Sequence, residues 1–591
     1  VTMGSIFKDG RRILVRPKSL IICLCLISII FTQLIRYQYQ LIADEVQPTI
    51  NEDHSSSQSL KNTKLNSTRC SSPISPPKSL NKLTSQEFWE HIFNISEINK
   101  FDDGLKPLIK YTPKEQQLTT KIKTRDWLLS KANIFHKDII RQYHESVLRN
   151  LPSKLPKSVY TPNTYGIVTI GGNFYSWMAY IQLLQLRKLG SNLPVEILIP
   201  SIEDYYKEAH FCDHVLPQYN AKCILVPEKL GFNVAKHWKF SSYQFKALAL
   251  CLSSFQHVLI LDSDNVVLLK PEKVFDSPVY RDNGMVLWPD YWERTISPEW
   301  YDIIGKPVVG NKQVRTGRFP VNIHNMLTSE LEINETRFHD LEGALPDLST
   351  ESGQVMFNKK THGKVMLMTL YYNIFGPEIY YKLFSLGALG EGDKDTFAAA
   401  ALACGEKYYQ VASSIRTLGY FDTTPGGGFH GMAMAQKNPQ LDYQLFQKTN
   451  QNFKDLHLDW DNEAKDQFSA NNKIPIFTMH CNIKKINPAA YMKDEKIANM
   501  DEKRMNVRFY SNLKFKLNDD DIYSPDNEKE KNKSEKTDND PNEIDFELSR
   551  WQIVYEILCD QKITFQFLKD DNMDEVCQFV KNTIAWLGKK T

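Results

Sequence analysis

The chain has 591 residues, of which 42% are hydrophobic and 24% charged, enough to bury a large core in one big domain or two fused ones. Its 72 basic and 70 acidic residues leave a formal charge of +2. Such a balance provides no general attraction for nucleic acid, so we expect no nucleic-acid partner. Ten cysteines, none in a Cys-x-x-Cys pair, argue against a disulfide scaffold, a structural zinc site and redox chemistry.

The N-terminal region predicts a membrane anchor. The basic segment 1–18 precedes an uncharged, mostly apolar run over residues 19–35. As a helix this run would reach roughly 25 Å, slightly short of a ~30 Å hydrocarbon core but adequate for a thinner membrane. A cleaved signal peptide is the alternative, but no small-x-small cleavage site closes the run. The basic segment should remain cytosolic, which predicts type II topology with the rest of the chain in the lumen.

The residues after the anchor predict a flexible stem and then a helical region. Residues 36–86 include a stretch rich in Ser, Asn, Thr, Lys and Pro without sustained apolar periodicity. Residues 87–160 carry spaced apolar and aromatic positions that are typical of a few amphipathic helices. We expect these helices to pack on the catalytic domain.

Luminal placement predicts glycosylation and permits disulfides. Four Asn-x-Ser/Thr sequons begin at Asn66, Asn94, Asn334 and Asn532. The spacings of Cys212 with Cys223, and of Cys559 with Cys577, are compatible with two local disulfides. Buried free thiols are an equal alternative, because sequence does not fix connectivity.

From residue 161 to 517, strand and helix patterns alternate, which predicts an α/β domain with a largely parallel central sheet. The first strand ends in the Gly171-Gly172 turn, and the predicted order is strand 166–170, helix 175–189, strands 194–200 and 223–226, helix 240–254 and strand 258–262. The turn does not continue as G-x-G-x-x-G, and the chain has no P-loop motif. A nucleotide would therefore need a different kind of site.

The charged stretch 518–543 has almost no apolar residue and predicts a disordered insertion. Apolar periodicity resumes over residues 544–591, which predicts a C-terminal helical segment that docks back on the catalytic domain.

The central chemical signal is a buried strand that ends in Asp262-Ser263-Asp264. Ligands bind at the carboxyl ends of strands in open α/β sheets. Two unpaired carboxylates about 5 Å apart repel by roughly 3 kcal/mol at an effective dielectric constant of 20, and a divalent cation would convert this repulsion into affinity. A bare Asp-x-Asp also occurs on solvated loops, but its place at a strand end favours a metal that holds a diphosphate.

Further acids lie at the ends of predicted elements. Glu351 and Gln354 open an apolar strand, while Asp393 and Asp395 precede an Ala-rich helix. We predict that these four residues are catalytic. Helix capping is the alternative for the two aspartates, and a plain surface acid is the alternative for Glu351.

His480 ends a short apolar strand and is the predicted third metal ligand, although His430 in Phe429-His430-Gly431 competes for that role. Lys484 follows one helical turn later and is a candidate for phosphate binding. The full set predicted to bind the donor is Gly171, Gly172, Lys246, Asp262, Ser263, Asp264 and Lys484.

An aromatic cluster follows the predicted strand 284–287. Its rings could stack on sugar faces while neighbouring charged groups bond hydroxyls, and the predicted acceptor-binding residues are Trp288, Asp290, Trp292 and Arg294. The alternative is an ordinary aromatic core.

These residues resemble the fungal mannoprotein mannosyltransferases of glycosyltransferase family 71, the MNN type. The resemblance covers roughly residues 165–488 and is carried by Leu261-Asp262-Ser263-Asp264-Asn265, Gly284-Met285-Val286-Leu287-Trp288-Pro289-Asp290-Tyr291-Trp292, Glu351-Ser352-Gly353-Gln354, Tyr371-Tyr372-Asn373, Gly390-Glu391-Gly392-Asp393-Lys394-Asp395-Thr396-Phe397, Phe429-His430-Gly431 and Met479-His480-Cys481-Asn482.

The resemblance implies a GT-A fold, a divalent metal (usually Mn²⁺) on Asp262 and Asp264, and GDP-mannose as the donor. It also implies a Golgi type II membrane enzyme that adds α-linked mannose to mannoprotein glycans with retention of configuration. Residues 343–354 and 426–434 are more similar to the α-1,2 branch than to the α-1,3 branch.

Three alternatives remain open: an α-1,3 linkage, a different nucleotide sugar such as UDP-galactose or UDP-N-acetylglucosamine, and a catalytically inactive carbohydrate-binding homologue. The intact Asp262, Asp264, Asp393 and His480 argue against the inactive homologue.

Overall fold

The computed structural model describes residues 6–8, 11–13, 80–101, 108–112, 122–422, 424, 426–517, 522 and 543–589. The predicted anchor, most of the predicted stem and most of the charged insertion lie outside these residues. Within the described ranges, no helix is both long enough and apolar enough to cross a membrane. Residues 1–66 and 67–591 are two compact units, and the described part of the first is a hairpin of β1 (Ile6–Lys8) and β2 (Arg11–Ile13).

The larger unit is built on a seven-stranded sheet in the order β14-β10-β13-β8-β5-β6-β7. Strands β5, β6, β7 and β8 run parallel, as do β10 and β14, whereas β13 is antiparallel to both of its neighbours. The prediction of a largely parallel sheet is therefore confirmed, with β13 as the exception. The strands are β5 (Thr161–Ile170), β6 (Val195–Ile199), β7 (Ala221–Leu225), β8 (Phe255–Leu261), β10 (Met285–Pro289), β13 (Thr350–Asn358) and β14 (Tyr409–Gln410).

Both faces of the sheet are covered, which explains why its strands are apolar runs rather than alternating ones. In β8, Val258 and Ile260 belong to one core cluster and Leu259 and Leu261 to the other. The first cluster includes α9 (Gln244–Leu252), α14 (Gly363–Ile374) and α16 (Thr396–Cys404). The second includes α5 (Phe174–Lys188) and the C-terminal helices α21 (Phe546–Tyr555) and α22 (Met573–Leu587).

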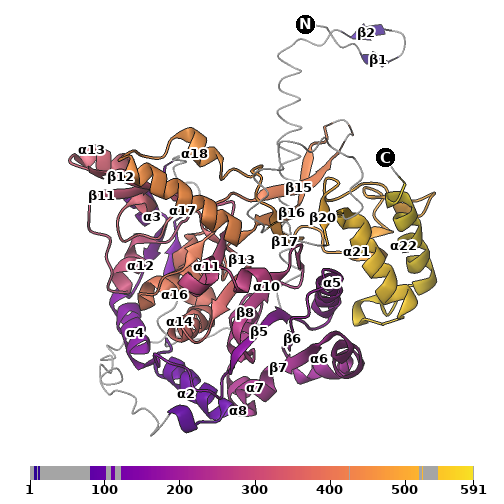
Figure 1. Ribbon diagram of the computed structural model, residues 1–591, viewed down its shortest axis with the longest axis horizontal. Helices are drawn as coiled ribbons and strands as arrows, with labels where there is room; N and C mark the ends of the chain where they lie inside the picture. The colour runs from indigo at the N-terminus through magenta and orange to yellow at the C-terminus, as the bar shows by residue number, and fades with distance from the viewer. Residues whose placement is uncertain are drawn as a thin grey trace. The chain divides into compact units, whose positions relative to one another are not determined.

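The C-terminal helices pack beside α5 (Figure 1). The Tyr180 hydroxyl of α5 donates to Gln561, and the rings of Trp177 and Phe565 lie 5.5 Å apart. Figure 1 also shows the N-terminal helices on the opposite side of the unit, where α2 (Ser85–Ile98) and α4 (Lys137–Asn150) contribute to the first cluster.

A second, four-stranded antiparallel sheet has the order β15-β16-β17-β9. It consists of β15 (Arg416–Phe421), β16 (Phe429–Lys437), β17 (Ile476–His480) and β9 (Asn265–Val267). Because only three residues separate the end of β8 from the start of β9, residues 262–264 connect the two sheets. The predicted metal-binding acids therefore lie at the junction of the sheets.

The remaining elements of more than two residues surround this frame. They are β3 (Ile109–Tyr111), α3 (Arg125–Leu129), β4 (Ala132–Ile134), α6 (Ile202–Lys207), α7 (Val226–Leu230), α8 (Phe232–His237), α10 (Pro271–Phe275), α11 (Pro278–Asn283), α12 (Pro298–Ile303), β11 (Lys312–Thr316), β12 (Phe319–Met326), α13 (Glu330–Glu335), α15 (Tyr381–Ser385), α17 (Pro439–Asp455), α18 (Asn462–Asp466), α19 (Pro488–Tyr491), β20 (Lys514–Lys516) and β21 (Glu543–Asp545), with short 3-10 and π turns between them.

The described part of the chain contains two disulfides. Cys212 bonds Cys223, and Cys559 bonds Cys577. The structure therefore decides the open alternative in favour of disulfides over free thiols at these four positions.

Candidate active site

The junction of the two sheets brings three predicted metal ligands together. His480 pairs with Asn265 in the β17–β9 ladder, and the backbone N–H of Cys481 donates to the Asp264 carbonyl at 2.9 Å. The Nε2 atom of His480 consequently lies 3.2 Å from an Asp264 oxygen and 3.8 Å from an Asp262 oxygen. One ligand atom from each of Asp262, Asp264 and His480 lies within 4.8 Å of the others.

This set fits a divalent cation. Two carboxylates and one imidazole combine oxygen ligands, which Mn²⁺ accepts, with a nitrogen ligand that suits first-row transition metals. Ser263 is buried between the two acids. His430, the competing candidate, lies on β16 and is exposed, with its ring 3.9 Å from Asp422.

The charged side chains of this cluster shift one another's pKa values. Burial opposes ionisation of Asp264, yet His480 and Lys485 outweigh it and hold the pKa of that carboxyl below its usual range. Burial raises the pKa of Asp262, with Lys246 and His480 acting in the opposite direction. Burial disfavours the charged form of His480, but Asp264 and Glu351 override it and raise the pKa of the imidazole. The two carboxylates therefore favour positive charge on the imidazole, and a metal bound through Nε2 would have to compete with a proton there.

Glu351 lies directly behind His480. Its carboxylate is 3.0 Å from His480 Nδ1 and also accepts from the Gly353 backbone N–H and the Gln354 amide. Such a contact fixes the tautomer that leaves Nε2 free to face the acids. Gln354 is fully buried and also accepts from Asn265 and Thr478. Both residues support the metal ligands, and a direct catalytic role for either stays a prediction.

Lys246 joins two other predicted residues. Its ammonium lies 3.2 Å from Asp262, 3.3 Å from Asp393 and 2.9 Å from the Ser352 hydroxyl. The Ser352 hydroxyl in turn donates to Asp393 at 3.2 Å. Burial raises the pKa of Asp393, and Lys246 opposes that effect. The predicted donor-binding Lys246 and the predicted catalytic Asp393 therefore belong to one network with the predicted metal-binding acids.

Asp395 does not join this network. It forms a fully buried ion pair with Arg294 at 2.5 Å and accepts from the Thr350 N–H. Asp395 is the N-cap residue of α16, as the capping alternative expects, but its side chain makes no capping hydrogen bond. Because neither side chain reaches solvent, the predictions of catalysis by Asp395 and sugar binding by Arg294 are corrected to a structural role.

The predicted aromatic site divides into a buried half and an exposed half. Trp288 is 0% exposed, stacks on Phe477 and donates from Nε1 to the Lys437 carbonyl at 2.9 Å. It belongs to the core, on strand β10 of the seven-stranded sheet, and its predicted sugar contact is wrong. Trp292 is 44% exposed, and Asp290 pairs with Lys394 at 2.9 Å. Trp292 is therefore the exposed member of the predicted set, Asp290 is buried in an ion pair, and acceptor binding by either stays a prediction.

The lysine closest to the metal-binding acids is Lys485, not the predicted Lys484. Lys485 lies 2.9 Å from Asp264, whereas Lys484 pairs with Asp494 at 2.8 Å. Lys485 also lies 5.2 Å from the centre of the Tyr175 ring at the start of α5. Sequence reasoning missed Lys485 and Tyr175, because the adjacent Lys484 fits the spacing argument equally well and Tyr175 carries no motif.

The Gly171-Gly172 turn follows β5, but its amides are already engaged. Gly171 N–H donates to the Leu198 carbonyl at 2.8 Å, and Gly172 N–H donates to the Ser176 hydroxyl at 2.8 Å. A Cβ on Gly171 would lie 2.5 Å from Ile197, and Gly172 has a φ of 95°. Glycine is required here for packing and backbone geometry. These two N–H groups therefore already have partners, and donor binding at Gly171 and Gly172 stays a prediction.

Comparisons with known proteins identify relatives along the whole chain. Residues 164–438 match a family model described as "Mannosyltransferase putative". A Candida albicans protein named alpha-1,2-mannosyltransferase MNN22 is 99% identical over 589 residues, which is 100% of both chains. C. albicans MNN23 is 42% identical (86% of this chain, 85% of that protein), and Saccharomyces cerevisiae MNN2 is 31% identical (92% and 88%); both carry the same activity name.

Solved structures resemble the chain much less. The galactosyltransferase LgtC has 12% sequence identity, a TM-score of 0.28 and coverage of 55% of this chain and 89% of its own, a likeness too weak to identify the fold. The family match ends at residue 438, so His480 and Lys485 lie outside it.

Proposed function

The chain belongs to the MNN family of alpha-1,2-mannosyltransferases, and from that premise we propose that it transfers mannose from GDP-mannose to α-mannoside branches of mannoprotein glycans. The observation that carries this proposal is the convergence of Asp262, Asp264 and His480 at the junction of the sheets. We propose a GT-A-like catalytic domain, since a metal site at the carboxyl end of a mostly parallel sheet suits a nucleotide diphosphate.

Asp262, Asp264 and His480 would hold the divalent cation, with Mn²⁺ as the proposed ion. When bound, such a cation supplies Lewis-acid stabilisation of the leaving diphosphate. Glu351 holds the His480 ring in place, and Lys485 adds a positive charge next to Asp264. The lysine is partly exposed, so its ammonium can reach a phosphate group while its stem remains anchored.

Asp393 is the proposed group for the sugar end of the donor. Its carboxylate is tied to Lys246 and Ser352, so it is fixed relative to Asp262. Transfer with retention excludes a single backside displacement. A carboxylate near the anomeric carbon would stabilise positive charge that develops there as the bond to phosphate breaks. The exposed Trp292 supports an acceptor site on the neighbouring loop.

We further propose a Golgi type II membrane protein with a luminal catalytic domain. The two disulfides support an oxidising compartment, because such bonds are rare in the cytosol. Protease treatment of sealed microsomes should leave the luminal domain intact. Digestion of the C-terminus in sealed vesicles would contradict the proposed orientation.

The deciding experiment is product analysis with purified enzyme, Mn²⁺, an α-mannoside acceptor and a panel of nucleotide sugars. We expect turnover with GDP-mannose and NMR signals of an α-1,2 linkage. A β-anomeric signal would refute retention, an α-1,3 signal would refute the linkage, and turnover only with a UDP-sugar would refute the donor. Asp264→Ala should abolish transfer while leaving the unfolding midpoint near that of the unmodified protein.

Two adjacent lysines provide a matched pair for the site assignment. Lys485→Ala removes the charge beside Asp264, and Lys484→Ala removes one paired with Asp494. We expect the first variant to raise the KM for GDP-mannose and the second to leave it near normal. The reverse order would reinstate the original assignment of Lys484.

A further inference from the structure

The turn formed by residues 171–173 borders the metal-binding acids. Strands β5 and β8 are parallel with Val168 opposite Ile260, so the end of β5 lies level with Asp262. Helix α5 follows the turn directly, and its Gln182 side chain donates to the Asp262 carbonyl at 2.7 Å. The position of the turn is therefore coupled to the position of the acids.

The backbone of this turn needs support. Gly172 has a φ of 95°, and Asn173 has a φ of 56° with a ψ of −121°. A residue with a side chain rarely adopts such angles, and the cost is of the order of 1–3 kcal/mol. The turn keeps this conformation only because surrounding groups fix it.

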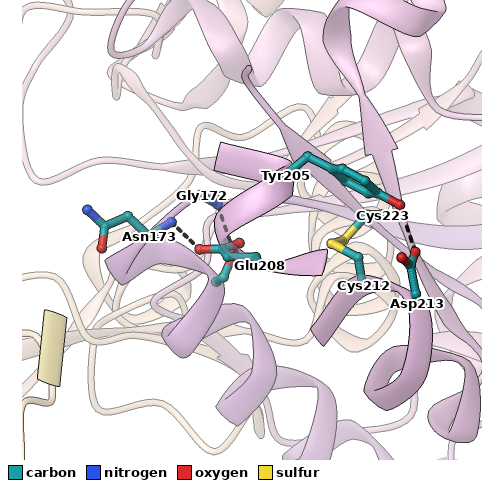
Figure 2. Close-up of a disulfide and its surroundings, with 8 residues drawn as sticks. Gly172, Asn173, Tyr205, Glu208, Cys212, Asp213 and Cys223 are labelled. Atoms are coloured by element: carbon teal, nitrogen blue, oxygen red, sulfur yellow. Dashed lines mark hydrogen bonds between the residues drawn. A yellow bond between two sulfur atoms is a disulfide. The ribbon is translucent and has the colours of Figure 1, made fainter. Parts of the chain in front are cut away.

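Glu208 supplies that support from another element (Figure 2). One carboxylate oxygen accepts from the Asn173 backbone N–H, and the other accepts from the Ser176 hydroxyl at 2.6 Å. The same hydroxyl accepts from the Gly172 N–H at 2.8 Å, so the Asn173 N–H bonds the carboxylate directly and the Gly172 N–H is linked to it through Ser176. The acid also lies at the N-terminus of α5, where the helix dipole favours a negative charge.

A disulfide secures the segment that carries Glu208. The backbone N–H of Cys212 donates to the Glu208 carbonyl at 2.9 Å, and Cys212 is bonded to Cys223 on β7. Figure 2 shows the carboxylate and the disulfide on the same short stretch of chain. The segment that carries Glu208 is therefore linked covalently to β7 of the seven-stranded sheet through Cys212.

The turn also places a group that contacts the proposed donor site. Tyr175 is 47% exposed and lies two residues after Asn173. Its ring centre is 5.2 Å from the Lys485 ammonium, which lies 2.9 Å from Asp264. Movement of the turn would shift this ring and change the environment of the lysine next to the metal-binding acids.

We propose that Glu208 is a positioning residue for donor binding, which acts by holding the 171–173 turn so that Tyr175 and Lys485 face the donor site. This inference rests on the proposed function of that site. Loss of the carboxylate should weaken donor binding more than it slows the transfer step, because Glu208 touches neither the metal ligands nor the reacting sugar. A purely architectural role would instead lower stability without changing the KM for the donor.

The test compares three variants of the enzyme with an intact disulfide. Glu208→Gln replaces an acceptor with a donor at one end, Ser176→Ala removes the hydroxyl link, and Asp213→Asn is the control. Asp213 is a carboxylate on the same segment, but its partner is the Tyr205 hydroxyl at 2.7 Å and it has no contact with the turn. Steady-state kinetics with GDP-mannose and acceptor would be measured together with unfolding midpoints, with and without GDP and Mn²⁺.

We expect Glu208→Gln to raise the KM for GDP-mannose about tenfold, the equivalent of one charge-assisted hydrogen bond, with a smaller change in kcat and little change in the acceptor KM. Ser176→Ala should act in the same direction, and the double variant should be less than additive because both changes break one network. GDP with Mn²⁺ should raise the unfolding midpoint less in these variants than in the control.

Two results would overturn the inference: an unchanged donor KM in both Glu208→Gln and Ser176→Ala, or an equal KM increase in Asp213→Asn. If Glu208→Gln does not fold, Ser176→Ala decides alone. Failure of the proposed function has a separate signature, which is absence of GDP-mannose turnover by the unmodified enzyme. In that event the shift of the unfolding midpoint by GDP and Mn²⁺, compared between the variants and the control, still decides the positioning role.

Discussion

Glu351→Gln tests how the proposed metal site is organised. The Glu351 carboxylate contacts His480 Nδ1 at 3.0 Å and accepts from the Gly353 N–H and the Gln354 amide. Glutamine has nearly the same shape, but its NH₂ group must face one of these donors. Rotation of Gln354 cannot relieve the clash cheaply, since its oxygen already accepts from Asn265 and Thr478.

The size of the effect follows from what Glu351 does for His480. A carboxylate on the far nitrogen of a metal-binding histidine fixes the tautomer and increases the basicity of the other nitrogen. Removal of such a partner typically lowers metal affinity about 10- to 100-fold, or roughly 1.4–2.8 kcal/mol. We expect Glu351→Gln to fall in this range, and Glu351→Ala to fall at its upper end because it also leaves the buried Gly353 N–H without its acceptor.

The assay is a titration of purified enzyme with Mn²⁺, with free ion followed by electron paramagnetic resonance and activity measured in parallel. At saturating Mn²⁺ the Glu351→Gln variant should recover much of its kcat. An unchanged metal affinity would refute the idea that Glu351 supports a metal-binding His480. A lost kcat that excess Mn²⁺ does not restore would instead favour a direct catalytic role for Glu351.

Three further predictions concern buried and exposed groups. Asp395→Asn should weaken the buried ion pair with Arg294 and lower the free energy of unfolding by about 3–5 kcal/mol. The unfolding midpoint should fall while the folded enzyme keeps its kcat/KM. Lost activity at an unchanged midpoint would support a catalytic role for Asp395. Burial raises the pKa of Glu547 from 4.5 to about 7. Between these pH values the folded protein still binds the proton that the unfolded chain has lost, so the free energy of unfolding falls as the pH rises. Glu547→Gln should therefore gain stability relative to the unmodified protein from pH 5 to pH 8, and a constant difference in thermal midpoint would contradict this. Trp292→Ala should raise the KM for the acceptor and leave the unfolding midpoint unchanged. Trp288→Ala should lower the free energy of unfolding by about 3–5 kcal/mol. Equal effects of the two changes on the unfolding midpoint would contradict the division between exposed and buried rings.

Sequence patterns predict the position of β8, the buried strand that ends next to the predicted metal ligands. The apolar run before Asp262 predicts a buried strand, because local hydrophobicity reports burial directly, and carboxylates after such a run predict a ligand site. His480 at a strand end was identified on the same grounds. The structure brings Asp262, Asp264 and His480 within 4.8 Å of one another, as this reasoning requires.

The errors arose where local pattern does not determine direction. Trp288 and Trp292 stand four residues apart in one motif, yet one lies in the core and the other is exposed. Asp393 and Asp395 are two residues apart, and only the first faces Lys246. Trp292 lies beyond the end of β10 and the two aspartates lie in the turn before α16, so packing against distant segments, not strand alternation, sets where these side chains point.

Hydrophobic pattern and residue chemistry are local properties, so the α/β domain and the carboxylates at a strand end can be predicted from the amino-acid sequence alone. Which groups surround those carboxylates depends on the tertiary fold. Pairing of β17 with β9 places His480 beside the acids, and the residues that follow β17 place Lys485, not Lys484, next to Asp264. Glu208 lies in a separate segment and bonds the Ser176 hydroxyl beside the turn after β5. Contacts between segments so distant in the chain depend on how the sheets pair and pack, which the local sequence of neither partner encodes.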